Sequence, residues 1–238
     1  MRSAVVTGAA GGIGSAVVER LVRDGWAVIA TDRVSPSSHR TAVRFIVGDL
    51  QDRALPRTLA DALAEAGTPT ALVNVAAMPS DARLVDTDDA LLEATLDVGL
   101  LAPFRLMRAI APLLGADGAI VNVASVHAAA TSIGAAAYVA AKGGLVALTR
   151  AAALELAPVR VNSVLPGAID TPMLRDGLDR GGQPAATALA DLHARTPLGR
   201  IGHVDEVASA IVWLLEATFV TGSSLTVDGG ALARLSTE

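Results

Sequence analysis

The 238-residue sequence contains no cysteine, and this absence excludes several kinds of site. Without thiols the chain can form neither a disulfide nor a thiolate metal centre. The histidines are His39, His127, His193 and His203, and their spacing is not typical of metal ligands. We therefore expect no structural metal.

Aromatic residues are also scarce, at 3% of the sequence, whereas 52% of the residues are apolar. The core must therefore be built mainly from Ala, Val, Leu and Ile, which suits close packing of helices on a sheet, and the composition does not suggest disorder. The formal net charge is −5, and the arginines are scattered rather than clustered. Because a phosphate backbone would find no basic face, we expect no nucleic-acid partner.

The sequence also lacks a convincing signal peptide or membrane span. The short apolar run near the start ends at Thr7-Gly8, which is too brief and too rich in glycine for a signal peptide, so we expect a cytoplasmic protein. Residues 118–141 contain no Asp, Glu, Lys or Arg. They do contain Asn122, Ser125 and His127, which would each need a polar partner in lipid. This stretch predicts a buried strand, a loop and a helix start, and no membrane contact.

Short apolar runs alternate with longer segments of helical periodicity along the whole chain. Because the runs are continuously apolar, they predict a parallel sheet covered on both faces. With right-handed crossovers this order predicts an α/β fold, a single-domain Rossmann-type doubly wound parallel sheet of about seven strands. The predicted strands are 4–7, 27–31, 43–47, 71–75, 119–123, 160–165 and 224–227, and the predicted helices are 13–23, 55–66, 90–114, 136–156 and 204–215.

Residues 1–238 are thus expected to form one dinucleotide-binding and catalytic domain. One stretch stands apart within it. Residues 170–195 contain Gly177, Gly181, Gly182 and Pro184, which interrupt short helical fragments. Long insertions of this kind in a compact fold are often lids, so we expect a mobile substrate lid there.

A glycine-rich motif follows the first predicted strand and opens the first predicted helix. It reads Thr7-Gly8-Ala9-Ala10-Gly11-Gly12-Ile13-Gly14. In this position Gly8 permits a tight turn, while Gly12 and Gly14 let a pyrophosphate approach the N–H groups at the helix start. A glycine-rich turn can be purely structural, but the strand–turn–helix setting favours a dinucleotide site that includes Ile13.

Two acidic residues at strand ends bear on the choice of cofactor. Asp32 ends the second strand, where Rossmann units place a carboxylate that accepts hydrogen bonds from the adenosine ribose. Such a carboxylate repels a 2′-phosphate, so NAD is favoured over NADP. Arg33 could partly offset this repulsion, or it could simply pair with Asp32 in solvent. Asp49, which precedes Leu50 after the third strand, could bind the adenine amino group or cap the following helix.

The sequence contains a single tyrosine, Tyr138, and a single lysine, Lys142. They lie four residues apart in a helical pattern and so share one helix face. Every other basic residue is Arg, which indicates that Lys142 serves a site needing a compact ammonium group. The alternative is two unrelated residues on an amphipathic helix. Ser125 ends the fifth predicted strand, at the edge where open α/β sheets bind ligands.

Taken in order, these residues make the chain similar to the short-chain dehydrogenase/reductase family from end to end. The resemblance implies an enzyme that transfers a hydride between a nicotinamide cofactor and the CH–OH group of a secondary alcohol or its ketone. The matching segments are Thr7–Gly14, Asn74-Val75-Ala76-Ala77, Ser125, Tyr138-Val139-Ala140-Ala141-Lys142, Pro166-Gly167 and Val227-Asp228-Gly229-Gly230.

The resemblance also assigns roles to individual residues. It implies that Tyr138 exchanges a proton with the substrate oxygen as general acid or base, and that Ser125 hydrogen-bonds the same oxygen. Lys142 would bind the nicotinamide ribose and lower the pKa of the tyrosine. Ile169 and Thr171 would hold the nicotinamide carboxamide. The remaining implied cofactor contacts are Asn74, Ala76, Pro166 and Gly167.

Substrate and assembly are less sharply indicated. We expect a small or medium alcohol with an apolar body, and in this family the helices at 90–114 and 136–156 commonly pair across two-fold axes. Their wide apolar faces predict a homotetramer, with a dimer as the alternative. Candidate substrate contacts are His127, Met78 and Met173, with Leu174 and His193 as further pocket walls, although Met and Leu at such spacing can be ordinary core.

The chain departs from the family pattern at two positions. Ala77 replaces a usual glycine, and Gly99 replaces a usual asparagine that supports a proton relay behind the lysine. Two alternatives therefore stay open, a catalytically weak cofactor-binding protein and an NADPH-dependent ketoreductase that uses Arg33. Because glycine is unfavourable inside a helix, we expect a kink or close backbone packing at Gly99 and an enzyme that still turns over.

Overall fold

The computed structural model describes residues 1–35, 43–180 and 182–234, so that His39 and Gly181 lie outside the described residues. A single parallel sheet runs through the molecule, with seven strands in the order β3-β2-β1-β4-β5-β6-β7. This confirms the predicted doubly wound sheet. The strands are β1 (Arg2–Thr7), β2 (Ala27–Asp32), β3 (Val43–Val47), β4 (Thr68–Asn74), β5 (Ala119–Val123), β6 (Arg160–Pro166) and β7 (Ser224–Val227).

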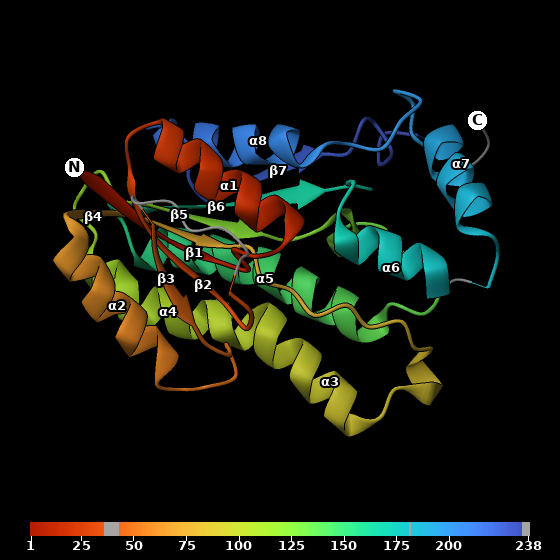
Figure 1. The fold of residues 1–238 in the computed structure, drawn as a ribbon, viewed down its shortest axis with the longest axis horizontal. Coiled ribbons are helices and arrows are strands. Elements are labelled where there is room, and N and C mark those ends of the chain that lie inside the picture. The colour runs from red at the N-terminus through yellow and green to blue at the C-terminus, as the bar shows by residue number, and fades with distance from the viewer. Residues whose placement is uncertain (36–42, 181, 235–238) are drawn as a thin grey trace.

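Helices cover both faces of the sheet, as Figure 1 shows. On one face α1 (Gly12–Arg23) and α8 (Val204–Glu216) pack over fully buried residues such as Val6 and Val17. On the other face lie α2 (Leu55–Ala66), α4 (Ala102–Ile110) and α5 (Ala136–Glu155), around residues such as Leu106 and Ile120. Because each central strand has an apolar layer on both sides, its sequence is mostly apolar along its length rather than at alternate positions only.

The predicted helix at 90–114 is not continuous. It consists of α3 (Asp89–Leu96), a π-helical turn η2 (Asp97–Leu101), α4 and a 3₁₀ turn η3 (Ala111–Leu113). Pro103 explains the interruption, because it has no N–H to donate to the Gly99 carbonyl four residues earlier and its ring would clash with that carbonyl. The departure from α-helical geometry thus falls at the π-helical turn that contains Gly99, and Pro103 was the sequence signal for it.

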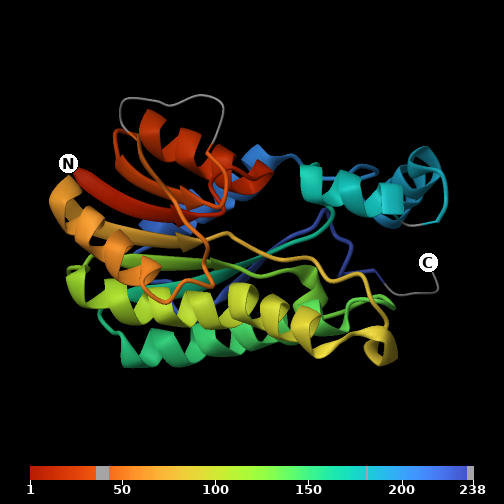
Figure 2. The same ribbon diagram turned by 60° about the horizontal axis from the view of Figure 1, so that its bottom comes forward.

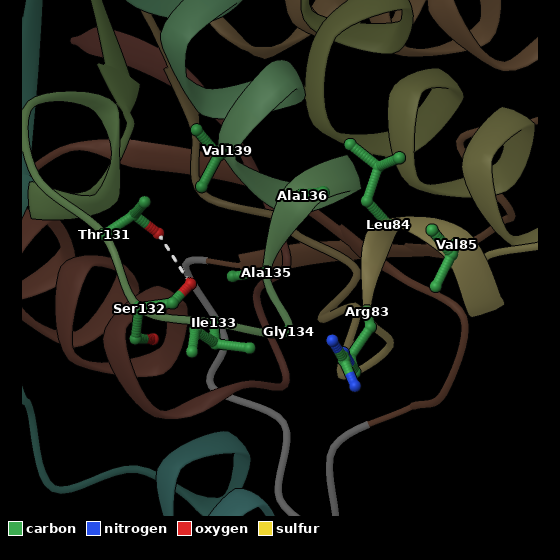
Figure 3. A pocket seen from close by; sticks show the side chains of 10 residues that line it. All are labelled: Arg83, Leu84, Val85, Thr131, Ser132, Ile133, Gly134, Ala135, Ala136 and Val139. Atoms are coloured by element: carbon green, nitrogen blue, oxygen red, sulfur yellow. Dashed lines mark hydrogen bonds between the residues drawn. The ribbon is translucent and has the colours of Figure 1, made fainter.

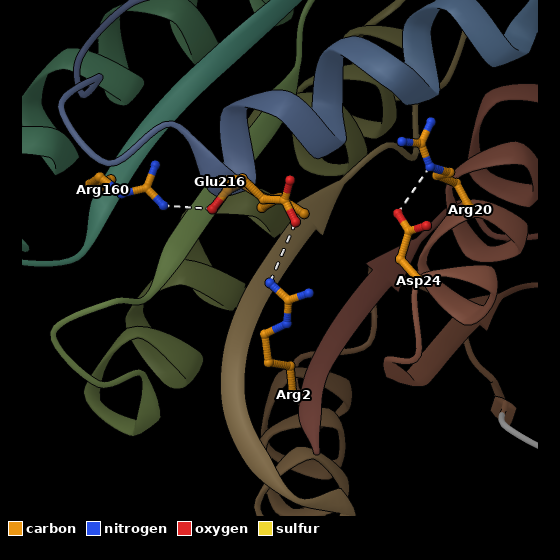
Figure 4. A network of polar contacts seen from close by, with 6 residues as sticks. Arg2, Arg20, Asp24, Arg160 and Glu216 are labelled. Carbon is orange, nitrogen blue, oxygen red and sulfur yellow. Dashed lines mark hydrogen bonds and ion pairs between the residues drawn. The ribbon is translucent and has the colours of Figure 1, made fainter.

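Polar contacts at the amino ends of the strands link α8 to the sheet and close the end of α1, and Figure 4 shows Arg2, Arg20, Asp24, Arg160 and Glu216. The Arg2 guanidinium lies 3.5 Å from the Glu216 carboxylate, and Arg20 pairs with Asp24 at 2.9 Å along α1. Arg160 donates to three carbonyls at the end of α8, those of Leu214, Leu215 and Ala217. These contacts lie at the opposite edge of the sheet from the residues discussed below, so their role is structural.

At the carboxyl edge of the sheet, the predicted lid segment carries α6 (Pro172–Arg180) and α7 (Ala185–Arg195). Figures 1 and 2 show both helices projecting beyond this edge. Ala188 is the one buried residue among the described residues of the two helices, so they are packed lightly against the body. The same edge carries the short 3₁₀ turns η1 (Leu84–Asp86) and η4 (Val126–Ala128). Across the described parts of the chain, no helix is long and apolar enough to cross a membrane.

Candidate active site

The glycine-rich motif lies at the carboxyl end of β1, where the strand order switches from β1-β2 to β1-β4. In open α/β sheets this switch point is where ligands bind. The Thr7 hydroxyl accepts hydrogen bonds from the N–H groups of Val75 at 3.1 Å and Ala76 at 3.3 Å. The end of β1 is thereby fixed to the loop that follows β4.

The glycines of this motif sit where side chains do not fit. Gly8 has φ +64°, and a Cβ there would lie 2.8 Å from the Ala76 backbone. A Cβ on Gly14 would lie 2.0 Å from the Gly8 carbonyl oxygen, and one on Gly12 would lie 2.9 Å from Thr171 Cγ2. Helix α1 begins at Gly12 with no side-chain cap. Its first N–H groups and the positive end of its dipole suit a pyrophosphate group.

Asp32 has a second role that the sequence did not reveal. One carboxylate oxygen accepts a hydrogen bond from the Ala10 N–H at 3.0 Å, and the other from the Arg33 N–H at 2.7 Å. The carboxylate therefore helps to hold the glycine-rich loop. Since an ionised carboxylate has about four acceptor positions, it keeps capacity for ribose hydroxyls. Arg33 itself is exposed.

Asp49 forms a turn rather than a helix cap. Its carboxylate accepts a hydrogen bond from the Gln51 N–H at 2.9 Å, whereas α2 begins only at Leu55. The Leu50 side chain is buried in the core beneath α2, so only the backbone of that residue can face a ligand. The structure therefore shows an Asx turn at Asp49 in place of the predicted helix cap.

At the other end of the predicted cofactor site, the chain after β6 is held by backbone contacts. The Gly167 N–H donates to the Val227 carbonyl at 2.9 Å, directly after Pro166 ends the strand. Ile169 is buried and forms an isolated parallel bridge with Gly202. The Thr171 hydroxyl accepts from the Leu174 N–H at 3.2 Å and so caps the start of α6.

Asn74 begins a buried polar chain behind the site. Its amide donates to Asn122 Oδ1 at 2.8 Å, and the Asn122 amide donates to Thr149 Oγ1 at 2.9 Å. Within the described residues, the Asn74 Oδ1 atom is buried without a partner. The chain links β4, β5 and α5. Sequence analysis missed Asn122 and Thr149, although an asparagine inside the apolar β5 run was a usable signal.

Ser125, Tyr138 and Lys142 lie together at the carboxyl end of β5. Ser125 follows the strand and is buried, and its hydroxyl hydrogen-bonds the Tyr138 phenol. Tyr138 and Lys142 lie one turn apart on α5, with the Lys142 Nζ atom 5.7 Å from the Tyr138 ring centroid. Lys142 is 1% exposed and donates to the Val123 carbonyl at 2.7 Å. The structure therefore brings the three predicted catalytic residues into one cluster, in which Ser125 and Lys142 are buried and Tyr138 is half-buried.

Comparisons with known proteins show which family the chain belongs to. A family model described as enoyl-(acyl carrier protein) reductase matches residues 8–231. The short-chain reductase protein NovJ of Streptomyces niveus is 34% identical, over 95% of this chain and 92% of its own length. The chain belongs to the short-chain dehydrogenase/reductase family.

Relatives in this short-chain dehydrogenase/reductase family act on several alcohols. L-fucose dehydrogenase of Mus musculus is 37% identical, over 95% of this chain and 87% of its own. Among solved structures, ligand-free Thermoplasma acidophilum aldohexose dehydrogenase has a TM-score of 0.94 and 32% identity, covering 99% and 95% of the two chains. A 4-hydroxyisoleucine dehydrogenase complexed with NADH has a TM-score of 0.88 and 28% identity, covering 99% and 100%. The chain is a nicotinamide-dependent oxidoreductase that acts on CH–OH groups.

Burial shifts the pKa values of both titratable groups in the cluster. It raises the pKa of the Tyr138 phenol, an effect that the hydrogen bond with Ser125 partly opposes. It lowers the pKa of the Lys142 ammonium to about 8. Without a ligand the phenol is thus a poor base, and a nearby positive charge is needed to bring its pKa toward neutrality.

The predicted substrate contacts fall into two groups. The His127 ring packs edge-on against the Tyr138 ring, with centroids 5.8 Å apart. Met173 lies on the first turn of α6 and His193 on the last turn of α7, both in the predicted lid, while Met78 lies on the loop after β4. Of the predicted substrate contacts, His127 is thus shown against a predicted catalytic residue. Within the described ranges, no cluster of three or more His, Asp or Glu could hold a metal ion.

Gly99 lies in the η2 turn, where it is buried and faces Ala141 of α5. A Cβ at this position would lie 2.9 Å from the Ala141 Cβ, closer than real contacts allow. Ala141 immediately precedes Lys142. The absence of a side chain at Gly99 therefore has the expected local reason, since it lets the π-helical turn approach α5 beside the lysine.

Proposed function

We propose that this chain is an NAD(H)-dependent dehydrogenase that interconverts a secondary alcohol and its ketone, with Tyr138 as the general acid and base. The observation that carries the proposal is the cluster of Ser125, Tyr138 and Lys142 at the carboxyl end of β5, on the same edge of the sheet as the uncapped start of α1. A nicotinamide cofactor, when bound, supplies or accepts the hydride. The protein residues then bind the substrate oxygen and move its proton.

Each residue of the cluster has a distinct role in this proposal. The Ser125 hydroxyl hydrogen-bonds the substrate oxygen, and the adjacent Tyr138 phenol gives or takes the proton. Lys142 contributes a positive charge that lowers the pKa of Tyr138 and donors for the nicotinamide ribose. Since the pKa of Lys142 is about 8, that charge is present at neutral pH and is lost in alkaline solution.

The preference for NAD(H) rests on Asp32. Its carboxylate is fixed at the end of β2 by the Ala10 N–H, beside the predicted ribose position. A 2′-phosphate there would meet a negative charge, which disfavours NADPH. Arg33 is the residue that would favour the alternative, an NADPH-dependent ketoreductase, and its exposed position allows solvent to screen its charge.

The proposed substrate class is a small or medium ring-shaped secondary alcohol. Two of the similar proteins are named for sugars, L-fucose and aldohexose, and this supports a ring substrate. The helices of residues 170–195 stand over the carboxyl edge of the sheet, and we assign them the role of a mobile lid. All of these features fit one catalytic domain.

We further propose that the enzyme assembles as a homotetramer, with a dimer as the alternative. Leu101 and Phe104 are each 47% exposed beside α4, and Leu154 on α5 is 82% exposed. Large apolar side chains left in solvent on adjacent helices favour burial against another subunit. A symmetric pairing of these helices would bury all three.

Kinetics of the wild type and Tyr138→Phe test the proposed function. Initial rates with NAD⁺ and NADP⁺ across a panel of ring alcohols should show turnover with NAD⁺. Tyr138→Phe should abolish it while NADH affinity, measured by fluorescence titration, stays within about threefold, because the phenol acts on the substrate oxygen. A Phe variant that keeps most of its kcat would refute the assignment. A silent wild type that binds NADH would favour the cofactor-binding alternative.

A further inference from the structure

His127 is held between the two hydroxyl groups that the proposed function places on the reacting oxygen. Its backbone N–H donates to Ser125 Oγ at 3.2 Å. Its ring lies edge-on to the Tyr138 ring at an interplanar angle of 82°. The side chain is half-buried, so one edge of the ring stays accessible. A substrate that binds to Ser125 and Tyr138 therefore lies next to this imidazole.

The contacts of Thr131 bear on which nitrogen of the His127 ring carries the proton. The His127 Nδ1 atom lies 2.8 Å from Thr131 Oγ1. The Thr131 hydroxyl in turn donates to the Ser132 carbonyl at 3.4 Å, which Figure 3 shows as a dashed line. A hydroxyl has only one proton to give, so a Thr131 hydroxyl that donates to the Ser132 carbonyl must accept the proton of Nδ1, and we assign the ring this tautomer. Burial lowers the pKa of His127, which keeps the ring neutral at neutral pH.

The remaining ring nitrogen, Nε2, is then an acceptor with a free lone pair. In the described chain no hydrogen bond to Nε2 is formed, and the atom is not among the buried atoms without a partner, so a ligand can reach it. An acceptor fixed beside the reacting carbon suits a donor group on the substrate. A hydroxyl on the neighbouring carbon is such a donor, whereas a carboxylate or a ketone oxygen has no proton to offer.

We propose that His127 determines specificity by accepting a hydrogen bond from a second substrate hydroxyl, so that the preferred substrate is a vicinal diol. The inference rests on the proposed function, because it places the substrate oxygen on Ser125 and Tyr138. Thr131 acts through His127 as a positioning residue. A simple alcohol of the same shape would leave the imidazole acceptor without a partner, which lowers its kcat/KM.

Two substrates that differ by one hydroxyl test this inference, namely cis-cyclohexane-1,2-diol and cyclohexanol, each with NAD⁺. The wild type should prefer the diol by about tenfold or more in kcat/KM. His127→Phe keeps a ring against Tyr138 but removes the acceptor, and it should lower kcat/KM for the diol about tenfold, with cyclohexanol changed less than about threefold. His127→Gln places an amide oxygen near the position of Nε2 and should recover part of the preference.

A matched pair of variants separates the hydrogen bond from general disturbance of the loop. Thr131→Val removes the partner of Nδ1 and should reduce the diol preference several-fold, whereas Ser132→Ala, one residue further on, should leave it unchanged. If His127→Phe lowered kcat/KM equally for both substrates, this inference alone would be overturned, because His127 would then only shape the site by packing. Failure of every form of the enzyme to oxidise either alcohol would overturn the proposed function together with the inference.

Discussion

Adding one methyl group at Gly99 tests how closely the π-helical turn packs on the catalytic helix. In Gly99→Ala, the new Cβ would lie 2.9 Å from the Ala141 Cβ. Replacing glycine by alanine in a helix ordinarily stabilises a protein by about 0.5–1 kcal/mol. Overpacking of a closely packed contact costs about 1–3 kcal/mol. The second effect is larger, so we expect a net destabilisation of about 1 kcal/mol.

For a chain of this length, a loss of about 1 kcal/mol lowers the Tm by about 2–4 °C. Differential scanning calorimetry without cofactor, at one fixed protein concentration, measures this shift. Gly143 on α5 is the matched control, because a Cβ there meets nothing within 4 Å. Gly143→Ala should therefore raise the Tm, since it gains helix propensity without a steric cost.

The double variant Gly99→Ala with Ala141→Gly shows whether the two positions interact directly. Removing the Ala141 methyl group relieves the overlap, so the two substitutions should be non-additive by about 1 kcal/mol. The single Gly99→Ala variant should also lower kcat a few-fold, because Ala141 precedes Lys142 and any shift of α5 displaces the ammonium group. If Gly99→Ala raised the Tm as Gly143→Ala does, the close-packing explanation of Gly99 would be wrong.

Three further predictions concern charge, cofactor and assembly. Burial lowers the pKa of Lys142 from 10.5 to about 8, so the unfolded chain binds more protons between these values and stability rises with pH across that window. The Tm of the ligand-free wild type should therefore rise between about pH 8 and pH 10, and Lys142→Met should flatten that rise. If Lys142→Met left the slope of Tm against pH unchanged, the lowered pKa of Lys142 would not be the cause of the rise. By calorimetric titration, NADH should bind at least about tenfold more tightly than NADPH, a difference of about 1.4 kcal/mol. Asp32→Asn, which keeps an acceptor for the Ala10 N–H, should narrow that gap, and equal affinities in the wild type would refute the role of Asp32. Light scattering at micromolar concentration should give the mass of a tetramer for the wild type and a smaller mass for Phe104→Asp. A monomeric wild type would refute the proposed assembly.

The amino-acid sequence alone determined the strands, most of the helices and the layered architecture. The predicted strands 43–47, 119–123 and 224–227 match β3, β5 and β7 at both ends. Such elements are readable because backbone hydrogen bonding and the burial of both sheet faces impose a local apolar pattern. The predicted helix at 90–114 is helical in the structure but not α-helical throughout, because Pro103 lacks an N–H, and this too is a local property that could have been used.

The residues that carry the proposed chemistry were also readable, because a fixed spacing places them. Tyr138 and Lys142 are four residues apart on one helix, and one helical turn puts both side chains on the same face wherever the helix lies. The glycine-rich motif could also be recognised from the sequence, since its position between a strand and a helix is a local feature. Neither inference required knowledge of what lies across the sheet.

Only the tertiary structure decided which distant groups complete the site. The Asp32 carboxylate accepts a hydrogen bond from the Ala10 N–H, and hydrogen bonds of Asn122 connect Asn74 on β4 with Thr149 on α5. The approach of Gly99 to Ala141, which explains the missing side chain, likewise joins separate helices. Contacts of this kind depend on where the loops end relative to one another after the layers have packed. The pattern of residues within one segment does not encode the distance between two loops, because that distance arises from the packing of all the segments together.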